Sequence, residues 1–167
     1  MASRRRQRRP PADGDFEDPL KNYESVDPED AMTNSLLHGK VAQMRIKPFM
    51  SVLPGATIAS VITDMAQMNI ACVMIEENAK LAGIFSERDV LTKIADRFDE
   101  IKDQPVRTVM TLDPVAVYDT DSPAKALNLM AIGGFRHIPV VNVDDQVVGI
   151  LGPNRVTEHI QTHFEGN

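Results

Sequence analysis

The stretch KLAGIFSERD, residues 80–89, is matched 66 residues later by QVVGILGPNR, residues 146–155. Each stretch runs from an apolar strand through a glycine to a turn that begins a helix. Around them, residues 49–96 and 114–163 both predict a short strand, a helix, a strand hairpin and a second helix. A duplicated unit must bury its apolar face against its twin, so the chain predicts two packed copies of one α/β unit.

The matches further upstream keep a constant spacing. Three of them lie 65 residues apart: Val52 with Val117, Thr57 with Ser122, and Met65-Ala66 with Met130-Ala131. One extra residue in the second copy then makes the spacing 66. Constant spacing over a whole unit indicates duplication of that unit, because chance similarity would not keep it.

Composition limits the class of protein. The 167 residues are 43% apolar, which is enough for a core, and no apolar run approaches the roughly 20 residues of a membrane span. Cys72 is the single cysteine, so an internal disulfide is excluded and a cytoplasmic location is expected. The net charge is −6, but residues 1–10 carry five arginines, so the remainder holds 13 basic against 24 acidic residues, or −11. Such an acidic body disfavours nucleic-acid binding.

Local signals predict the elements. Residues 1–30 suggest disorder, Ala31–Leu37 a helix and Val41–Ile46 a strand. Caps are expected at Thr57, Ser86 and Ser122, and Gly133-Gly134 ends a helix. The predicted strands of the two copies are Phe49–Val52, Cys72–Ile75, Leu81–Phe85, Val115–Val117, Ile138–Val141 and Val147–Leu151.

Four segments resemble the cystathionine-β-synthase (CBS) domain, present as a tandem pair: KLAGIFSERDVL (80–91), VMTLDPVAV (109–117), FRHIPVV (135–141) and VVGIL (147–151). The resemblance covers about residues 44–164. It implies an N-terminal extension over 1–40 and repeats over 41–99 and 104–164. The implied fold is α/β (α+β), with two β-α-β-β-α repeats related by a pseudo-twofold axis.

The resemblance also implies a function. Such pairs, often called Bateman modules, bind adenosine-containing ligands in clefts between the repeats. AMP, ADP or ATP is expected here, ahead of S-adenosylmethionine or NAD. Such pairs often form homodimers and regulate a partner protein without catalysing a reaction themselves. No nucleophile and base pair, Walker loop or HExxH motif appears in the sequence, in keeping with a regulatory module.

The ligand motif of the family is Gly, two apolar residues, Ser or Thr, two variable residues, then Asp, and it matches residues 83–89. The residues themselves indicate the same chemistry. A hydroxyl at Ser86, where a strand ends and a helix begins, suits a phosphate, and Asp89 can accept both ribose hydroxyls. Ile84, Cys72 and Met74 can enclose an adenine. Alternatively, Ser86 and Asp89 only cap the helix.

Basic residues complete the candidate site. Arg88 occupies a variable position of the motif. In the family, basic residues at the positions of Arg136 and His137 face the cleft and can reach phosphates. His137 would add a pH dependence near neutrality. The alternative is that Arg136 lies on the surface and that His137 is packed.

The second copy departs from the motif. Gly152 has no hydroxyl, Pro153 has no amide hydrogen, and Arg155 replaces the ribose-binding Asp. The second site is therefore expected to be empty, to take an anion through Arg155 and Asn154, or to be purely structural. We expect one nucleotide per chain.

Three weaker signals remain. His159 and His163 have the i, i+4 spacing of metal ligands, although a solvated helix face explains them as well. Cys72, in an apolar strand, is expected to be a core residue. The run RRRQRR (4–9) could bind a nucleic acid or an acidic partner, so an arm-mediated nucleic-acid factor stays open, as does a ligand-free dimerisation module.

Overall fold

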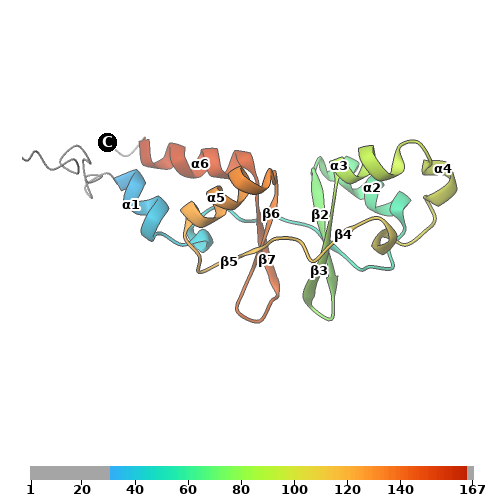
Figure 1. The fold of residues 1–167 in the computed structure, drawn as a ribbon, viewed down its shortest axis with the longest axis horizontal. Coiled ribbons are helices and arrows are strands. Elements are labelled where there is room, and N and C mark those ends of the chain that lie inside the picture. Colours follow the sequence, from blue (N-terminus) through green and yellow to red (C-terminus); the bar gives the residue numbers. More distant parts are fainter. Residues whose placement is uncertain (1–30, 165–167) are drawn as a thin grey trace, which may run out of the picture.

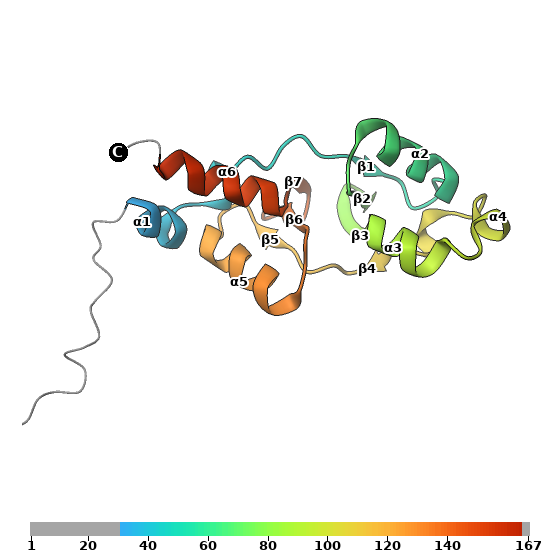
Figure 2. The ribbon, with the colours of Figure 1, turned by 90° about the horizontal axis from the view of Figure 1, so that it is seen from above.

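The computed structural model describes residues 31–164, which form two lobes side by side (Figure 1). The Arg-rich run and the predictions for residues 1–30 lie outside the described residues. One lobe is built on a sheet with the strand order β1-β2-β3-β4, and the other on a sheet with the order β5-β6-β7. The two hairpins, β2-β3 and β6-β7, stand next to each other where the lobes meet (Figures 1 and 2).

The elements follow the predicted duplication. The first copy contains β1 (Ser51–Val52), α2 (Ile58–Met68), β2 (Cys72–Glu77), β3 (Lys80–Ser86), α3 (Glu87–Asp89), the π-helical turn η3 (Val90–Ile94) and α4 (Phe98–Ile101). The second contains β5 (Val117–Tyr118), α5 (Pro123–Gly133), β6 (Ile138–Val141), β7 (Val147–Leu151) and α6 (Pro153–Phe164). The first copy is preceded by α1 (Ala31–His38) and the 3₁₀ turn η2 (Val41–Gln43). The second copy is preceded by the 3₁₀ turn η4 (Val106–Thr108) and β4 (Thr111–Leu112). The β-α-β-β-α pattern is confirmed in both copies.

The predicted caps set the helix boundaries. The side chains of Thr57 and Ser122 accept hydrogen bonds from backbone amides in the first turns of α2 and α5. Pro123 follows Ser122 at the first helical position, where its missing amide hydrogen costs nothing. Gly134 ends α5 with φ of +64°, a left-handed conformation that glycine adopts without strain.

The two copies exchange the segments that lead into them. β4 precedes the second copy but pairs with β3 of the first. In the same way, Ile46 precedes the first copy, and its carbonyl accepts a hydrogen bond from Ile150 of β7. The turns are exchanged too, because Val41 donates to the Asp121 carbonyl and Val106 to the Ala56 carbonyl. Each copy is therefore completed by a segment that belongs to the other.

Three apolar clusters stabilise this arrangement. Each lobe has its own core, one around Phe85 and Ile58 and the other around Ile138 and Leu151. A third cluster lies between the two sheets and contains Cys72, Met74 and Ile150, with Phe49, Leu81, Ile84 and Val147 packed against it. Burial of apolar area at roughly 25 cal/mol per Å² makes such a cluster the main force that holds the repeats together.

Two contacts join the hairpin tips. The Lys80 ammonium lies 3.1 Å from the Asp145 carboxylate, and the Leu81 amide donates to the Asp145 carbonyl. The ion pair is exposed, so it contributes little to stability.

Some predicted boundaries were wrong. Val41–Ile46 is not a strand, because Val41–Gln43 forms the turn η2 and only Ile46 joins a sheet edge. The strand expected at Phe49–Val52 shortens to β1, and the one expected at Val115–Val117 begins later, as β5 at Val117–Tyr118. By contrast, Ile138–Val141 and Val147–Leu151 are strands over the predicted residues.

Candidate functional site

The Ser86–Asp89 motif forms the predicted capping box. The Asp89 amide lies 3.4 Å from Ser86 Oγ, while the Ser86 amide donates to Asp89 Oδ2 at 2.9 Å. The Ser86 hydroxyl also donates to Asp89 Oδ2 at 2.7 Å. These reciprocal bonds satisfy backbone amides at the turn from β3 into α3. The helix-cap function of this pair is therefore real, and a ligand function would come in addition to it.

Two further donors reach the Asp89 carboxylate. Lys93 Nζ lies 2.6 Å from Asp89 Oδ1, and Thr111 Oγ1 donates to the same oxygen at 3.3 Å. Lys93 also donates to the Val109 carbonyl at 2.8 Å. Burial alone would raise the pKa of Asp89, but the hydrogen bonds from Lys93 and Ser86 and the Lys93 charge hold it below its usual value. Asp89 is ionised at neutral pH, although only 7% of the residue is exposed.

Arg136 and His137 of the second repeat directly precede β6. His137 is half-buried against Gly152, where an added Cβ would come within 3.0 Å of the imidazole Cδ2. Burial lowers the pKa of His137, and the charges of Arg136 and Arg155 lower it further, although Glu87 of the first repeat opposes them. His137 is therefore neutral at pH 7, and Arg136 is exposed.

The apolar residues expected to enclose an adenine are less accessible. Met74 is fully buried and Cys72 nearly so, both in the cluster between the sheets, and only Ile84 keeps exposed surface. Burial raises the pKa of the Cys72 thiol to about 12, against the opposing charge of Arg155. Cys72 is thus a protonated core residue, as its apolar strand indicates. Arg88 is exposed on α3.

The second motif has a different geometry. Arg155, where the first copy has Asp89, donates to the Ile150 carbonyl at 2.8 Å and to the Pro48 carbonyl. Its guanidinium therefore joins α6 to the segment that leads into the first repeat. Since both terminal nitrogens of the guanidinium already donate to these carbonyls, the geometry favours a structural Arg155 over an anion contact. Asn154, the other residue expected to hold an anion, is exposed at the start of α6.

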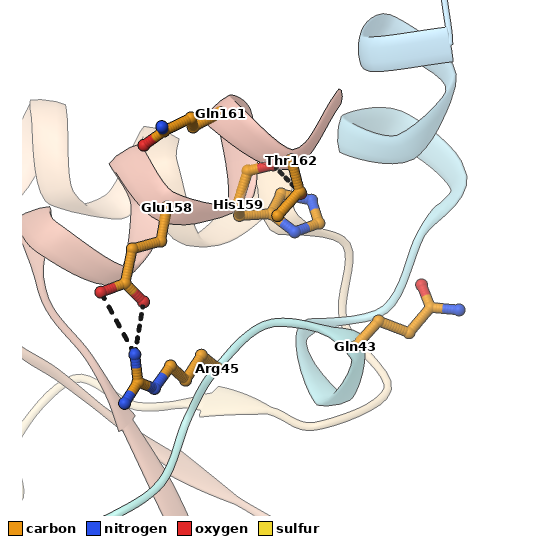
Figure 3. A pocket seen from close by; sticks show the side chains of 6 residues that line it. All are labelled: Gln43, Arg45, Glu158, His159, Gln161 and Thr162. Carbon is orange, nitrogen blue, oxygen red and sulfur yellow. Dashed lines mark hydrogen bonds and ion pairs between the residues drawn. The ribbon is translucent and has the colours of Figure 1, made fainter. Parts of the chain in front are cut away.

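A polar hollow of about 510 Å³ lies elsewhere, between α6 and the segment after α1 (Figure 3). Its lining residues are Gln43, Arg45, Glu158, His159, Gln161 and Thr162. Arg45 and Glu158 form an ion pair across it at 3.4 Å, and His159 Nε2 lies 3.1 Å from the Ser35 hydroxyl of α1. In the part of the chain that the structure describes, no three His, Cys, Asp or Glu residues gather where they could hold a metal. The side chain of His163 lies outside the described residues.

Sequence reasoning missed Lys93, Thr111 and the carbonyl of Pro48. The spacing of 65 continues upstream to Val41–Gln43 and Val106–Thr108, but it does not indicate that Thr111 of β4 pairs into the sheet of the other copy.

The family follows from a comparison with known proteins. The sequence pattern of the CBS domain matches residues 41–96 and again residues 106–161. The chain belongs to the CBS-domain family. Its two CBS domains are the two repeats of the structure, and the resemblance noted in the sequence is confirmed.

Curated relatives agree with this membership. An uncharacterised 17.7 kDa protein of Acidianus ambivalens is 32% identical over 67% of this chain and 67% of its own length. The CBS domain-containing protein CBSCBSPB5 of Arabidopsis thaliana is 32% identical over 66% of this chain but only 20% of its own length. An inosine-5'-monophosphate dehydrogenase of Methanocaldococcus jannaschii matches over 22% of that enzyme. Five of the curated relatives, all from Arabidopsis thaliana, are named as CBS domain-containing proteins without an enzyme activity.

Solved CBS structures share the fold. The CBS domain protein PAE2072 from Pyrobaculum aerophilum, complexed with AMP, has a TM-score of 0.64 and 26% identity over 74% of this chain and 98% of that one. CBSX2 of Arabidopsis thaliana has a TM-score of 0.66 and 21% identity over 77% of this chain and 97% of that one, which shows the fold alone. In the described part of the CBS pair, no helix is long and apolar enough to cross a membrane.

Proposed function

We propose that this CBS pair is a cytoplasmic regulatory module that binds an adenine nucleotide through the first motif and passes the signal to a partner protein. The observation that carries the proposal is the ionised, largely buried Asp89 carboxylate, which is bound to Ser86 at the turn from β3 into α3. A carboxylate suits a ribose diol and a guanidinium suits phosphate, so the two repeats offer complementary chemistry. The AMP complex of the similar PAE2072 protein supports the ligand class.

The asymmetry of the motifs supports one nucleotide per chain. Arg155 stands where a second ribose-binding carboxylate would be needed, and its guanidinium is bound to backbone carbonyls. We therefore expect a stoichiometry near one in calorimetric titrations, with AMP, ADP, ATP, S-adenosylmethionine and NAD tested in turn. Two equivalent sites in the unmodified protein would contradict the structural function of Arg155.

The decisive experiment compares two aspartates. Asp89→Ala should weaken AMP binding by about 1.5–3 kcal/mol, because hydrogen bonds from the ribose to a charged acceptor are lost. Asp99→Ala is the matched control, since the Asp99 side chain is 90% exposed and forms an ion pair with Lys102 at the end of α4, outside the motif. AMP should also bind more tightly than 2′-deoxy-AMP, and this preference should vanish in Asp89→Ala. Equal affinities for AMP in wild type and Asp89→Ala would leave Asp89 as a helix cap only.

A homodimer is part of the proposal. Leu91 of η3 and Ile132 of α5 are 75% and 82% exposed, and apolar side chains that open to water on helices favour cover by a second copy. Light scattering of the wild type should therefore give twice the chain mass, and Leu91→Glu with Ile132→Glu should give a monomer. Val143→Glu, at the equally exposed tip of the β6-β7 hairpin, is the control that should stay dimeric. A wild-type monomer at micromolar concentration would disprove this part.

A further inference from the structure

Every acceptor position of the Asp89 carboxylate is taken by a donor from the protein itself. Two donors from Ser86 reach Oδ2, and Lys93 and Thr111 reach Oδ1. A carboxylate offers about four lone-pair positions, so none is left for a ribose. We infer that Lys93 is an intramolecular competitor of the ribose and sets the affinity of the first site. The inference rests on the proposed function, because it concerns the same site.

Of these donors, Lys93 is the one that can leave. The Ser86 bonds belong to the capping box and hold the start of α3, so their loss would cost the turn itself. The Thr111 bond is the longest of the four, at 3.3 Å. Lys93 has a flexible four-carbon stem and a side chain that is 36% exposed, so its ammonium can withdraw into water without disturbing the backbone. A ribose hydroxyl would then take the Oδ1 position that Lys93 gives up.

The same ammonium connects the motif to the neighbouring segment. Lys93 Nζ donates to the Val109 carbonyl at 2.8 Å and lies 3.4 Å from Thr111 Oγ1, and both residues belong to the exchanged segment that leads into the second repeat. Displacing Lys93 from Asp89 would therefore loosen a contact between η3 and that segment. A ligand shifts a conformational equilibrium only through contacts that differ between its states, and this ammonium provides such a difference.

Lys93→Met tests the competition, since methionine keeps an unbranched stem and removes the charge. Lys125→Met is the matched control, because Lys125 forms an equivalent i, i+4 ion pair with Asp121 at 2.8 Å in the second repeat. AMP affinity is measured by calorimetry at pH 7, and the Asp89 pKa by the NMR titration of its carboxyl carbon without nucleotide. We expect Lys93→Met to bind AMP about three- to tenfold more tightly, up to 1.4 kcal/mol, and Lys125→Met to bind as the wild type does.

The titration separates the possible failures. In Lys93→Met the Asp89 pKa should rise from its lowered wild-type value, and an unchanged pKa would show that the contact is absent in solution and overturn the inference. Unchanged or weaker AMP binding by Lys93→Met would overturn it too, while the nucleotide function stands. Absence of AMP binding in both proteins, with the pKa shifted, would refute the proposed function instead. If Lys93→Met fails to fold, Lys93→Gln gives the same comparison with a polar side chain.

Discussion

Arg155 offers the strongest test of how the two repeats are held together. Its guanidinium donates to the Ile150 carbonyl of β7 and to the Pro48 carbonyl, so one side chain joins the second repeat to the segment that leads into the first. Methionine at this position keeps much of the stem and removes both bonds. A hydrogen bond from a charged donor contributes about 1.5–3 kcal/mol, and the partial exposure of Arg155 lets water replace part of each. We therefore expect Arg155→Met to lower the free energy of unfolding by about 2–3 kcal/mol.

Urea denaturation measures this loss. The chain concentration is kept fixed, because dimerisation would make the apparent stability depend on it. A matching fall in the melting temperature, of roughly 5–10 °C, is expected for a chain of this size. Arg155→Lys should recover about half the loss, since an ammonium lacks the planar fork that spans two carbonyls.

The control is another arginine of the same region. Arg45 forms only an exposed ion pair with Glu158, with exposed side-chain fractions of 69% and 47%. Arg45→Met should change stability by less than about 0.5 kcal/mol. If Arg155→Met and Arg45→Met cost the same, the guanidinium bonds of Arg155 do not hold the repeats together, and the structural interpretation of the second motif is wrong.

Two further predictions concern the glycine contacts and pH. Gly149→Ala should cost about 1–3 kcal/mol, because a Cβ there would lie 2.5 Å from Ile46 Cβ, whereas Gly55→Ala, with open space around it, should be nearly neutral in the same urea assay. His137 has a folded-state pKa below its ordinary value, so its contribution to stability is present above pH about 6.5 and is lost as pH falls through the lowered pKa. Between pH 7.5 and 5.5, His137→Gln should therefore lose less stability than the wild type, and parallel losses would contradict the burial of neutral His137.

The sequence was sufficient wherever local chemistry and repetition agreed. Ser86, Ser122 and Gly134 sit at helix boundaries for local reasons, and the continuous apolar strand Ile138–Val141 is buried over its whole length. Repetition supported the cap at Ser122, which matches Thr57, whereas Ser86 has Gly152 as its counterpart. The prediction from sequence failed at Val41–Ile46, where alternating apolar residues suggested a strand. The hydrogen-bond partners of this segment lie in the other repeat, more than 70 residues away. Non-local pairing of this kind leaves no periodic signal in the segment itself.

The residue types of the candidate site were predicted from the sequence, but the partners of Asp89 and Arg155 were not. The capping box follows from the spacing of Ser86 and Asp89, and the i, i+4 spacing of Asp89 and Lys93 permits their ion pair, yet the donation of Thr111 to the same carboxylate depends on the exchanged segment. Likewise, the replacement of Asp by Arg155 was read as a lost ligand contact, while its new partner, the Pro48 carbonyl, could not be foreseen without the exchange of segments.

That exchange explains why the two copies agree in some places and differ in others. Gly83 and Gly149 occupy equivalent positions, and at each of them an added Cβ would collide with the exchanged segment, with Met110 at 2.7 Å or Ile46 at 2.5 Å. Both copies need this close approach, so both need glycine. The positions of Asp89 and Arg155 lie one helical turn beyond the strand, where the exchanged segment presents Thr111 to the first and the Pro48 carbonyl to the second. The Asp89 carboxylate accepts a hydrogen bond from the Thr111 hydroxyl, and the Arg155 guanidinium donates one to the Pro48 carbonyl, so in each copy this residue bonds to the exchanged segment. Only the first copy keeps an acidic group that a ribose could use.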